Sequence, residues 1–279
     1  MIPTLADKEI IIEKDTLDTQ YWKDLWNYRE LFYFLAWRDI KVRYKQTVIG
    51  VLWAVLRPVL TMIVFSFVFG RLAGLPSEGN VPYPVLVYAA LLPWQFFAHS
   101  LGESSNSLIV NVNLISKVYM PRLILPASSI VVNLVDFLIS FGILGLIMAF
   151  YRFAPGVRIL TVPLFLLMAF VTAYGFSIWF GALNVRYRDF RYIVPFVVQF
   201  GLYISPVGFS STIVPEQWRL IYSLNPMVGV IDGFRWAILG GDVRLYWPGF
   251  ALSLILTIVV AVTGLKYFRS TERTFADVI

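Results

Sequence analysis

The sequence predicts an all-α polytopic membrane protein with six transmembrane helices. Of its 279 residues, 58% are hydrophobic and only 14% are charged, and the mean hydropathy is +0.72. Soluble domains carry about a quarter charged residues. A membrane-spanning helix needs about 20 mostly apolar residues, so the chain has room for about six spans and little else.

Six apolar segments have the required length. We expect these spans at 48–70, 84–102, 123–151, 159–185, 193–210 and 246–267, within a transmembrane domain of residues 47–267. Residues 1–20 and 268–279 are predicted to be polar tails.

Residues 21–46 are predicted to form an amphipathic helix before the first span. Aromatic and aliphatic residues recur there with helical spacing, and the segment ends in a basic run that includes Arg38 and Arg43. Such a helix suits the membrane surface. Docking on a partner subunit is nearly as well supported.

Two further segments are too polar to cross a membrane. Residues 103–122 combine serines and asparagines with an apolar face and end at Pro121, so we expect a short helix on one membrane surface. Residues 212–240 are expected to form two short helices that dip into one leaflet. Pro215 and Asn225 mark their starts, and Gly240-Gly241 marks the end.

Polar residues inside the predicted spans are the first candidate functional groups. Arg57 lies in span one, while Asn133 and Asp136 lie on one polar face of span three. A charge in a span should be paired or hydrated, so we predict that Asp136 is the counter-ion of Arg57. A role for Asp136 as a proton relay stays open.

The fifth span carries a second polar stripe. Tyr192, Phe196, Gln199, Tyr203 and Pro206 recur at helical spacing after the basic run 186–191. This face is expected to line a water-filled path or a partner helix. Ordinary helix packing with an interfacial aromatic residue is the alternative.

The distribution of basic residues predicts the orientation. Sixteen of the 23 Lys and Arg residues lie in the N-terminal region, segment 103–122, the 186–192 loop and the C-terminal end, against six in the other loops. By the positive-inside rule both termini are cytoplasmic and residues 210–245 are external.

Several kinds of chemistry are absent from the sequence. The chain has no cysteine and one histidine, His99, so it offers no histidine-rich or thiolate metal site. No phosphate-binding G-x-x-x-x-G-K-[ST] loop or nucleophile motif occurs. We therefore expect no catalytic residue and no cofactor in this chain. Energy for transport must come from another chain or an ion gradient.

Several clusters resemble the membrane subunits of ABC-2-type polysaccharide exporters, which secrete O-antigen, capsule or teichoic acid chains. The matching runs are 38–44 (RDIKVRY), Gly50-x-x-Trp53 with Pro58, Ile115-x-Lys117-x-x-x-Pro121-Arg122, 184–190 (NVRYRDF), Val194-Pro195-Phe196 with Gln199, Ser205-Pro206-Val207, Leu224-Asn225-Pro226-Met227 and Gly233-Phe234-Arg235. The resemblance covers about residues 25–270.

This resemblance implies a six-spanning permease of the bacterial inner membrane. Such permeases work as a homodimer with two copies of a separate ATPase subunit, which binds ATP and Mg. It implies a lipid-linked polysaccharide substrate, membrane lipids as neighbours and no nucleic acid. Segment 103–122 would be the coupling helix, 21–46 the interfacial helix and 212–240 the gating helices at the outer mouth.

The resemblance also assigns roles to individual residues. The coupling residues would be Arg38, Asp39, Arg43, Leu108, Val112, Ile115, Lys117, Arg122, Arg186, Arg188 and Arg191. The external gate would include Pro215, Trp218, Asn225, Pro226, Phe234 and Arg235. Since the C–H face of a sugar packs on aromatic rings, the channel would be lined by Trp53, Arg57, Tyr88, Phe196, Gln199 and Tyr203.

Two other functions are considered. An ion-coupled secondary transporter would use Arg57, Asp136 and His99. A membrane-embedded transferase would need embedded or loop carboxylates, but Glu216, Asp232 and Asp242 are better explained as partners of neighbouring arginines.

Overall fold

The computed structural model describes residues 17–45, 48–187, 189–241, 243–272 and 275, and these residues form helices joined by short loops. Arg188, Asp242 and most of the two predicted tails lie outside this range. The α-helices are α1 (Leu17–Asn27), α2 (Arg29–Lys45), α3 (Val48–Phe65), α4 (Tyr83–Val110), α5 (Val112–Lys117), α6 (Ile124–Phe150), α7 (Val162–Arg186), α8 (Phe190–Ile204), α9 (Glu216–Tyr222), α10 (Pro226–Leu239) and α11 (Trp247–Thr271). Three shorter helical turns are η1 (Ser66–Leu72), η2 (Val157–Thr161) and η3 (Ser211–Ile213).

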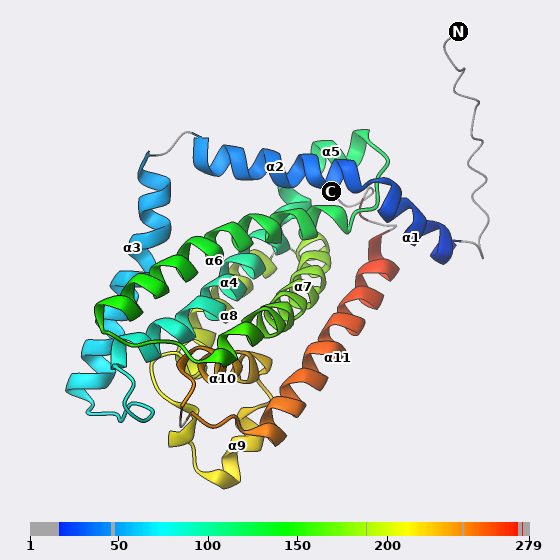
Figure 1. The fold of residues 1–279 in the computed structure, drawn as a ribbon. Coiled ribbons are helices and arrows are strands. Elements are labelled where there is room, and N and C mark those ends of the chain that lie inside the picture. Colours follow the sequence, from blue (N-terminus) through cyan, green and yellow to red (C-terminus); the bar gives the residue numbers. More distant parts are fainter. Residues whose placement is uncertain (1–16, 46–47, 188, 242, 273–274, 276–279) are drawn as a thin grey trace.

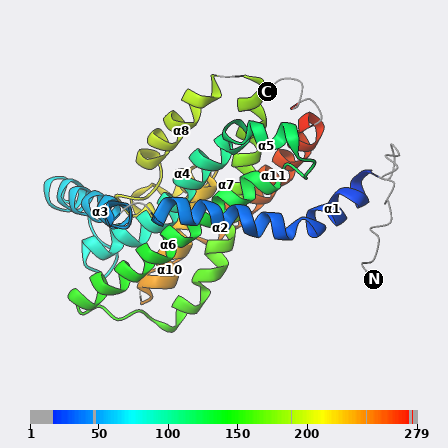
Figure 2. The same ribbon diagram turned by 90° about the horizontal axis from the view of Figure 1, so that it is seen from above.

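The long helices form a bundle with two distinct ends (Figure 1). Helices α2 and α5 lie across one end, which we call the α2 end. Helices α9 and α10 and the turn after α3 lie at the opposite end, which we call the α10 end. Seen from above, α2 crosses over α6, while α3 and α8 stand at the margin of the bundle (Figure 2).

Within the residues that the structure describes, five helical segments are long and apolar enough to cross a membrane. These are 55–72, Tyr83–Val110, Ile124–Phe150, 157–186 and Trp247–Thr271. The predicted fifth span contains α8, which is apolar but only 15 residues long. At 1.5 Å per residue α8 spans about 22 Å, less than the hydrocarbon core of about 30 Å.

Helix α4 is the central helix of the bundle. In its apolar window 83% of the residues are buried, against 17% for the span formed by α3 and η1. It also runs to Val110, beyond the predicted end at residue 102. The polar residues after Gly102 do not interrupt it because their side chains bond to carbonyls of the preceding turn. Asn106 and Ser107 donate to the Gly102 and Ser104 carbonyls at 2.9 and 2.7 Å.

Helices α7 and α11 pack closely along their small residues. A Cβ atom at Gly175 would lie 2.9 Å from the backbone of Ala261, and the Thr172 and Thr257 hydroxyls are 2.9 Å apart. Helix α10 packs in the same way: Gly229 meets Ser253 of α11 and Gly233 meets Phe165 of α7. The two glycines, four residues apart, therefore let α10 approach both neighbouring helices closely.

Candidate functional site

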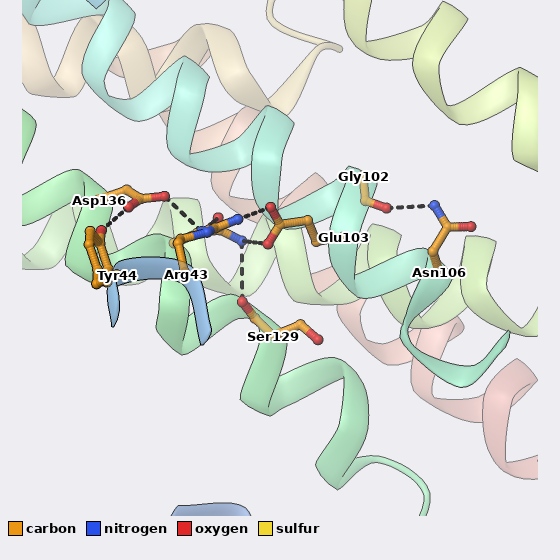
Figure 3. Close-up of polar contacts among 8 residues, drawn as sticks. Arg43, Tyr44, Gly102, Glu103, Asn106, Ser129 and Asp136 are labelled. Carbon is orange, nitrogen blue, oxygen red and sulfur yellow. Dashed lines mark hydrogen bonds and ion pairs between the residues drawn. The ribbon is translucent and has the colours of Figure 1, made fainter. Parts of the chain in front are cut away.

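A polar network joins three helices at the α2 end (Figure 3). Arg43, in the last turn of α2, donates to Asp136 at 2.8 Å and to the side-chain oxygen of Asn133 at 3.0 Å. Arg43 also pairs with Glu103 of α4, and the Tyr44 hydroxyl donates to Asp136. The network thus fixes the end of α2 to both α4 and α6.

Asn133 completes the network on α6. Its amide donates to Glu103 at 3.2 Å and to the Ser129 carbonyl at 3.2 Å. One arginine therefore lies between two carboxylates, and an amide bridges one of them to a helix backbone. Hydrogen bonds to charged partners are the strong kind, and the planar guanidinium serves several acceptors at once.

The network forms one wall of a cavity of about 400 Å³ between α2, α3, α4 and α6. Both polar and aromatic side chains line it. The lining residues are Arg43, Tyr44, Trp53, Arg57, Pro58, Leu92, Gln95, Phe96, His99, Glu103, Asn133, Asp136, Phe137 and Ser140. The volume lies in the range of small-ligand sites.

The predicted Arg57–Asp136 pair is wrong. Asp136 is held by Arg43 and Tyr44 instead, while Arg57 lines the same cavity from α3. The prediction considered only charges inside the spans. Arg43 belongs to the amphipathic helix before the first span, and it reaches Asp136 only because α2 crosses over α6. Tyr44 and Glu103 were missed for the same reason.

A different arginine site lies at the α10 end. Arg235 of α10 is 1% exposed and donates to the carbonyls of Phe209, Val207 and Leu86 at 2.8, 3.2 and 3.4 Å. It thereby ties α10 to the start of α4 and to the chain after α8. Nearby, burial raises the pKa of Asp232 to about 6, against the opposing effect of Arg235.

The profile of the ABC-2 type transporter family matches residues 30–239, well over half of the sequence. The chain belongs to this family.

Several relatives are similar to this ABC-2 transporter chain over nearly its full length. The O-antigen export system permease protein RfbA of Klebsiella pneumoniae is 28% identical, over 90% of this chain and 95% of its own. A protein of the same name from Myxococcus xanthus is 28% identical, over 92% of this chain and 98% of its own. The polysialic acid transport protein KpsM of Escherichia coli is 23% identical, over 84% and 91% of the two chains.

The residues predicted to line a channel lie in three different places in the structure. Trp53 and Arg57 line the cavity, whereas Phe196, Gln199 and Tyr203 do not. These three are exposed on α8, whose opposite side packs on α4, where a Cβ at Gly201 would lie 2.6 Å from Trp94. Tyr88 is fully buried inside the bundle, so its predicted place in the channel wall is wrong.

Some of the residues predicted to contact an ATPase face the chain itself, and others are exposed. Leu108 is fully buried, Arg43 belongs to the polar network, and Arg122 lies 5.7 Å from the ring of Phe275. The side chains of these three therefore face the chain itself. Val112 and Ile115 are half-buried, and Arg38 bonds to Asp39 and Asn111. Lys117, Arg186 and Arg191 are the exposed members among the described residues of the set, and Arg188 lies outside that range.

The predicted external-gate residues are partly internal. Asn225 caps α10 by accepting from the Met227 amide at 3.0 Å, as predicted, and donates to the Ser205 hydroxyl at 2.9 Å. Pro226, Phe234 and Arg235 are buried, so they hold the element in place and present no surface. Pro215 and Trp218, at the start of α9, are exposed.

Proposed function

We propose that this ABC-2 transporter chain is the transmembrane subunit of an ATP-driven exporter. Its substrate is a lipid-linked polysaccharide of the O-antigen, capsule or teichoic acid type, and it works in the bacterial cytoplasmic membrane. The observation that carries the proposal is the nearly full-length similarity to permeases named for O-antigen export and polysialic acid transport. A separate ATPase subunit binds ATP and Mg.

The proposed topology has six crossings and both termini in the cytoplasm. Helix α8, extended by the residues that follow it, adds the remaining crossing to the five long apolar segments and is the fifth in chain order. The concentration of Lys and Arg at the α2 end supports this orientation because cytoplasmic loops carry the excess of basic residues. Helices α9 and α10 then lie at the outer mouth.

The ATPase docks at the α2 end in this proposal, on α5 and the turn between α7 and α8. Among the described residues of these two segments and their edges, Lys117, Arg186 and Arg191 are exposed cations. Charge reversal in Lys117→Glu and Arg191→Glu is expected to weaken co-purification of the ATPase. Arg71→Glu, an exposed position at the α10 end, is the matched control. Undiminished capture with both α2-end reversals would contradict this docking surface.

The exposed stripe on α8 is proposed to face a second copy across a central passage. Phe196 and Phe200 stack with their centroids 5.7 Å apart, yet Phe196, Gln199 and Tyr203 remain exposed on this chain. Because the chain has no cysteine, Gln199→Cys gives a single thiol. We expect a short bis-maleimide to cross-link two copies at Gln199→Cys but not at Leu146→Cys, which is exposed on α6. The reverse pattern would place the dimer on another face.

One observation favours a second candidate function. Arg57, His99 and Asp136, the three groups expected of an ion-coupled transporter, all line one cavity. Export measured in vesicles separates the two functions. The proposed exporter stops on ATP depletion and continues when the proton gradient is collapsed, whereas an ion-coupled transporter does the opposite. The purified chain alone is expected to hydrolyse no ATP.

A further inference from the structure

Three polar side chains in the α2-end cavity take no part in the Arg43 network. Within the part of the chain that the structure describes, the side chains of Arg57, Gln95 and His99 make no hydrogen bond or ion pair, although all three line the cavity. Arg57 is exposed and Gln95 and His99 are half-buried, so all three have polar atoms open to a molecule in the cavity. Their convergence on one space indicates a ligand.

The three groups are arranged on two facing walls. Trp53 and Arg57 lie one helical turn apart on α3, and Gln95 and His99 lie one turn apart on α4. Residues four apart share a helix face. The cavity therefore has an aromatic ring and a guanidinium on one wall, and an amide and an imidazole on the other.

The charges of the cavity argue against an ionic ligand. Arg43 and Arg57 are balanced by Glu103 and Asp136, and the pairs between Arg43 and both carboxylates are already formed. An anionic headgroup would meet no net positive charge. Beside an aromatic face, Arg57 donates hydrogen bonds, while Gln95 and His99 can both donate and accept them, which suits a neutral molecule rich in hydroxyl groups.

We propose that this cavity binds a neutral sugar residue of the exported polymer. The C–H face of the sugar packs on Trp53, its hydroxyls accept from Arg57, and they exchange hydrogen bonds with Gln95 and His99. This inference rests on the proposed function, since the polymer is the source of the sugar. It differs from the passage between two copies because the cavity is walled by α2, α3, α4 and α6 of one chain.

The experiment uses the absence of cysteine in the chain. Ser140→Cys places a thiol in the cavity wall, and Ser270→Cys places one on the exposed end of α11 as a matched control. The full exporter in nanodiscs is labelled with a water-soluble maleimide in three conditions. These are buffer, the cell's own polysaccharide released from its lipid by mild acid, and inorganic pyrophosphate.

We expect the released polysaccharide to slow labelling of the Ser140→Cys thiol at least fivefold. Pyrophosphate should not change the rate, and neither probe should affect Ser270→Cys. Adding Trp53→Ala should abolish the protection, whereas Trp53→Phe should keep most of it. An unchanged labelling rate in buffer would show that these variants keep their fold.

The outcomes separate this site from the proposed function. ATP-dependent export without protection by the polysaccharide would overturn the sugar site alone. Protection by pyrophosphate would overturn it in favour of a phosphate site. Protection by the polysaccharide together with export that does not depend on ATP would support the sugar site and refute the proposed exporter.

Discussion

Arg43 and Arg235 hold opposite ends of the same bundle, and their partners differ in kind. Arg235 is 1% exposed and donates to three backbone carbonyls. The side chain of Arg43 is 30% exposed and is held by the side chains of Glu103, Asn133 and Asp136. Carbonyls cannot turn away without distorting the backbone, whereas carboxylates can change rotamer. The α10 end is therefore held through backbone groups and the α2 end through side chains, so we expect the α2 end to rearrange more easily.

Of the substitutions that test this comparison, replacing Arg235 is expected to lower the stability of the protein most. Arg235→Met removes the guanidinium that bonds the Phe209 and Val207 carbonyls and ties them to α10, and we expect a loss of roughly 3–5 kcal/mol of stability. Thermal unfolding in detergent measures it. Arg71→Met, at an exposed position of the same end, is the control and should unfold like the unmodified chain. An Arg235→Met protein of normal stability would show that the carbonyl contacts are dispensable.

A substitution that only adds side-chain volume between two apolar helices shows how much stability is lost when no charge is removed. Gly175→Leu forces a side chain against the backbone of Ala261, so we expect it to cost about 1–3 kcal/mol. Gly142→Leu is the matched control because a Cβ there meets nothing within 4 Å. Both proteins are compared by thermal unfolding. Equal stability of the two would mean that α7 and α11 can separate at little cost.

The pH dependence of stability tests the α10 end without removing Arg235. Burial raises the pKa of Asp232 to about 6, above its ordinary value of 3.8. The folded protein then holds this proton more tightly than the unfolded chain, so stability falls as the pH rises from about 4 to about 6. A rise of about two pKa units corresponds to a difference on the order of 3 kcal/mol.

Asp232→Asn should remove that part of the slope. Melting curves between pH 4 and pH 8 measure it, with Glu216→Gln on the exposed start of α9 as the control. A slope that is the same with and without the Asp232 carboxyl would mean that another group causes it.

Changing Arg43 should have the smallest effect on stability. Because the pair is partly exposed, Arg43→Gln is expected to cost less than about 1 kcal/mol. In the proposed exporter, however, it releases α2 from α4 and α6, and export in intact cells should fall about tenfold. Arg43→Lys keeps the charge but loses the forked geometry, so it should be intermediate. Normal export by Arg43→Gln would show that the network has no part in transport.

The sequence was sufficient to predict most of the architecture. The apolar runs marked the spans, and local signals located α9 and α10: Pro215 precedes α9, Asn225 caps α10, and Gly240 ends it with a φ of 59°. These features depend on residues close together in the chain, where helix periodicity and capping rules apply.

The site was less predictable because it depends on helix crossings. Asp136 was recognised as a charge that needs a partner, but Arg43 reaches it only because α2 lies over α6. The family resemblance implied that Leu108 contacts the ATPase, but the continuation of α4 buries it. Helices that are distant in sequence decide which face of a given helix is covered. The periodicity of one segment does not show which helices those are.

Helix α4 touches both arginine sites. Its Glu103 pairs with Arg43, and its Leu86 carbonyl accepts from Arg235, about 25 Å away along the axis. Pro93 lies between them and lacks the amide hydrogen that would close its turn. Because this hydrogen bond is missing, we expect α4 to bend most easily near Pro93, so a displacement of its Glu103 end would be absorbed before it reaches Leu86.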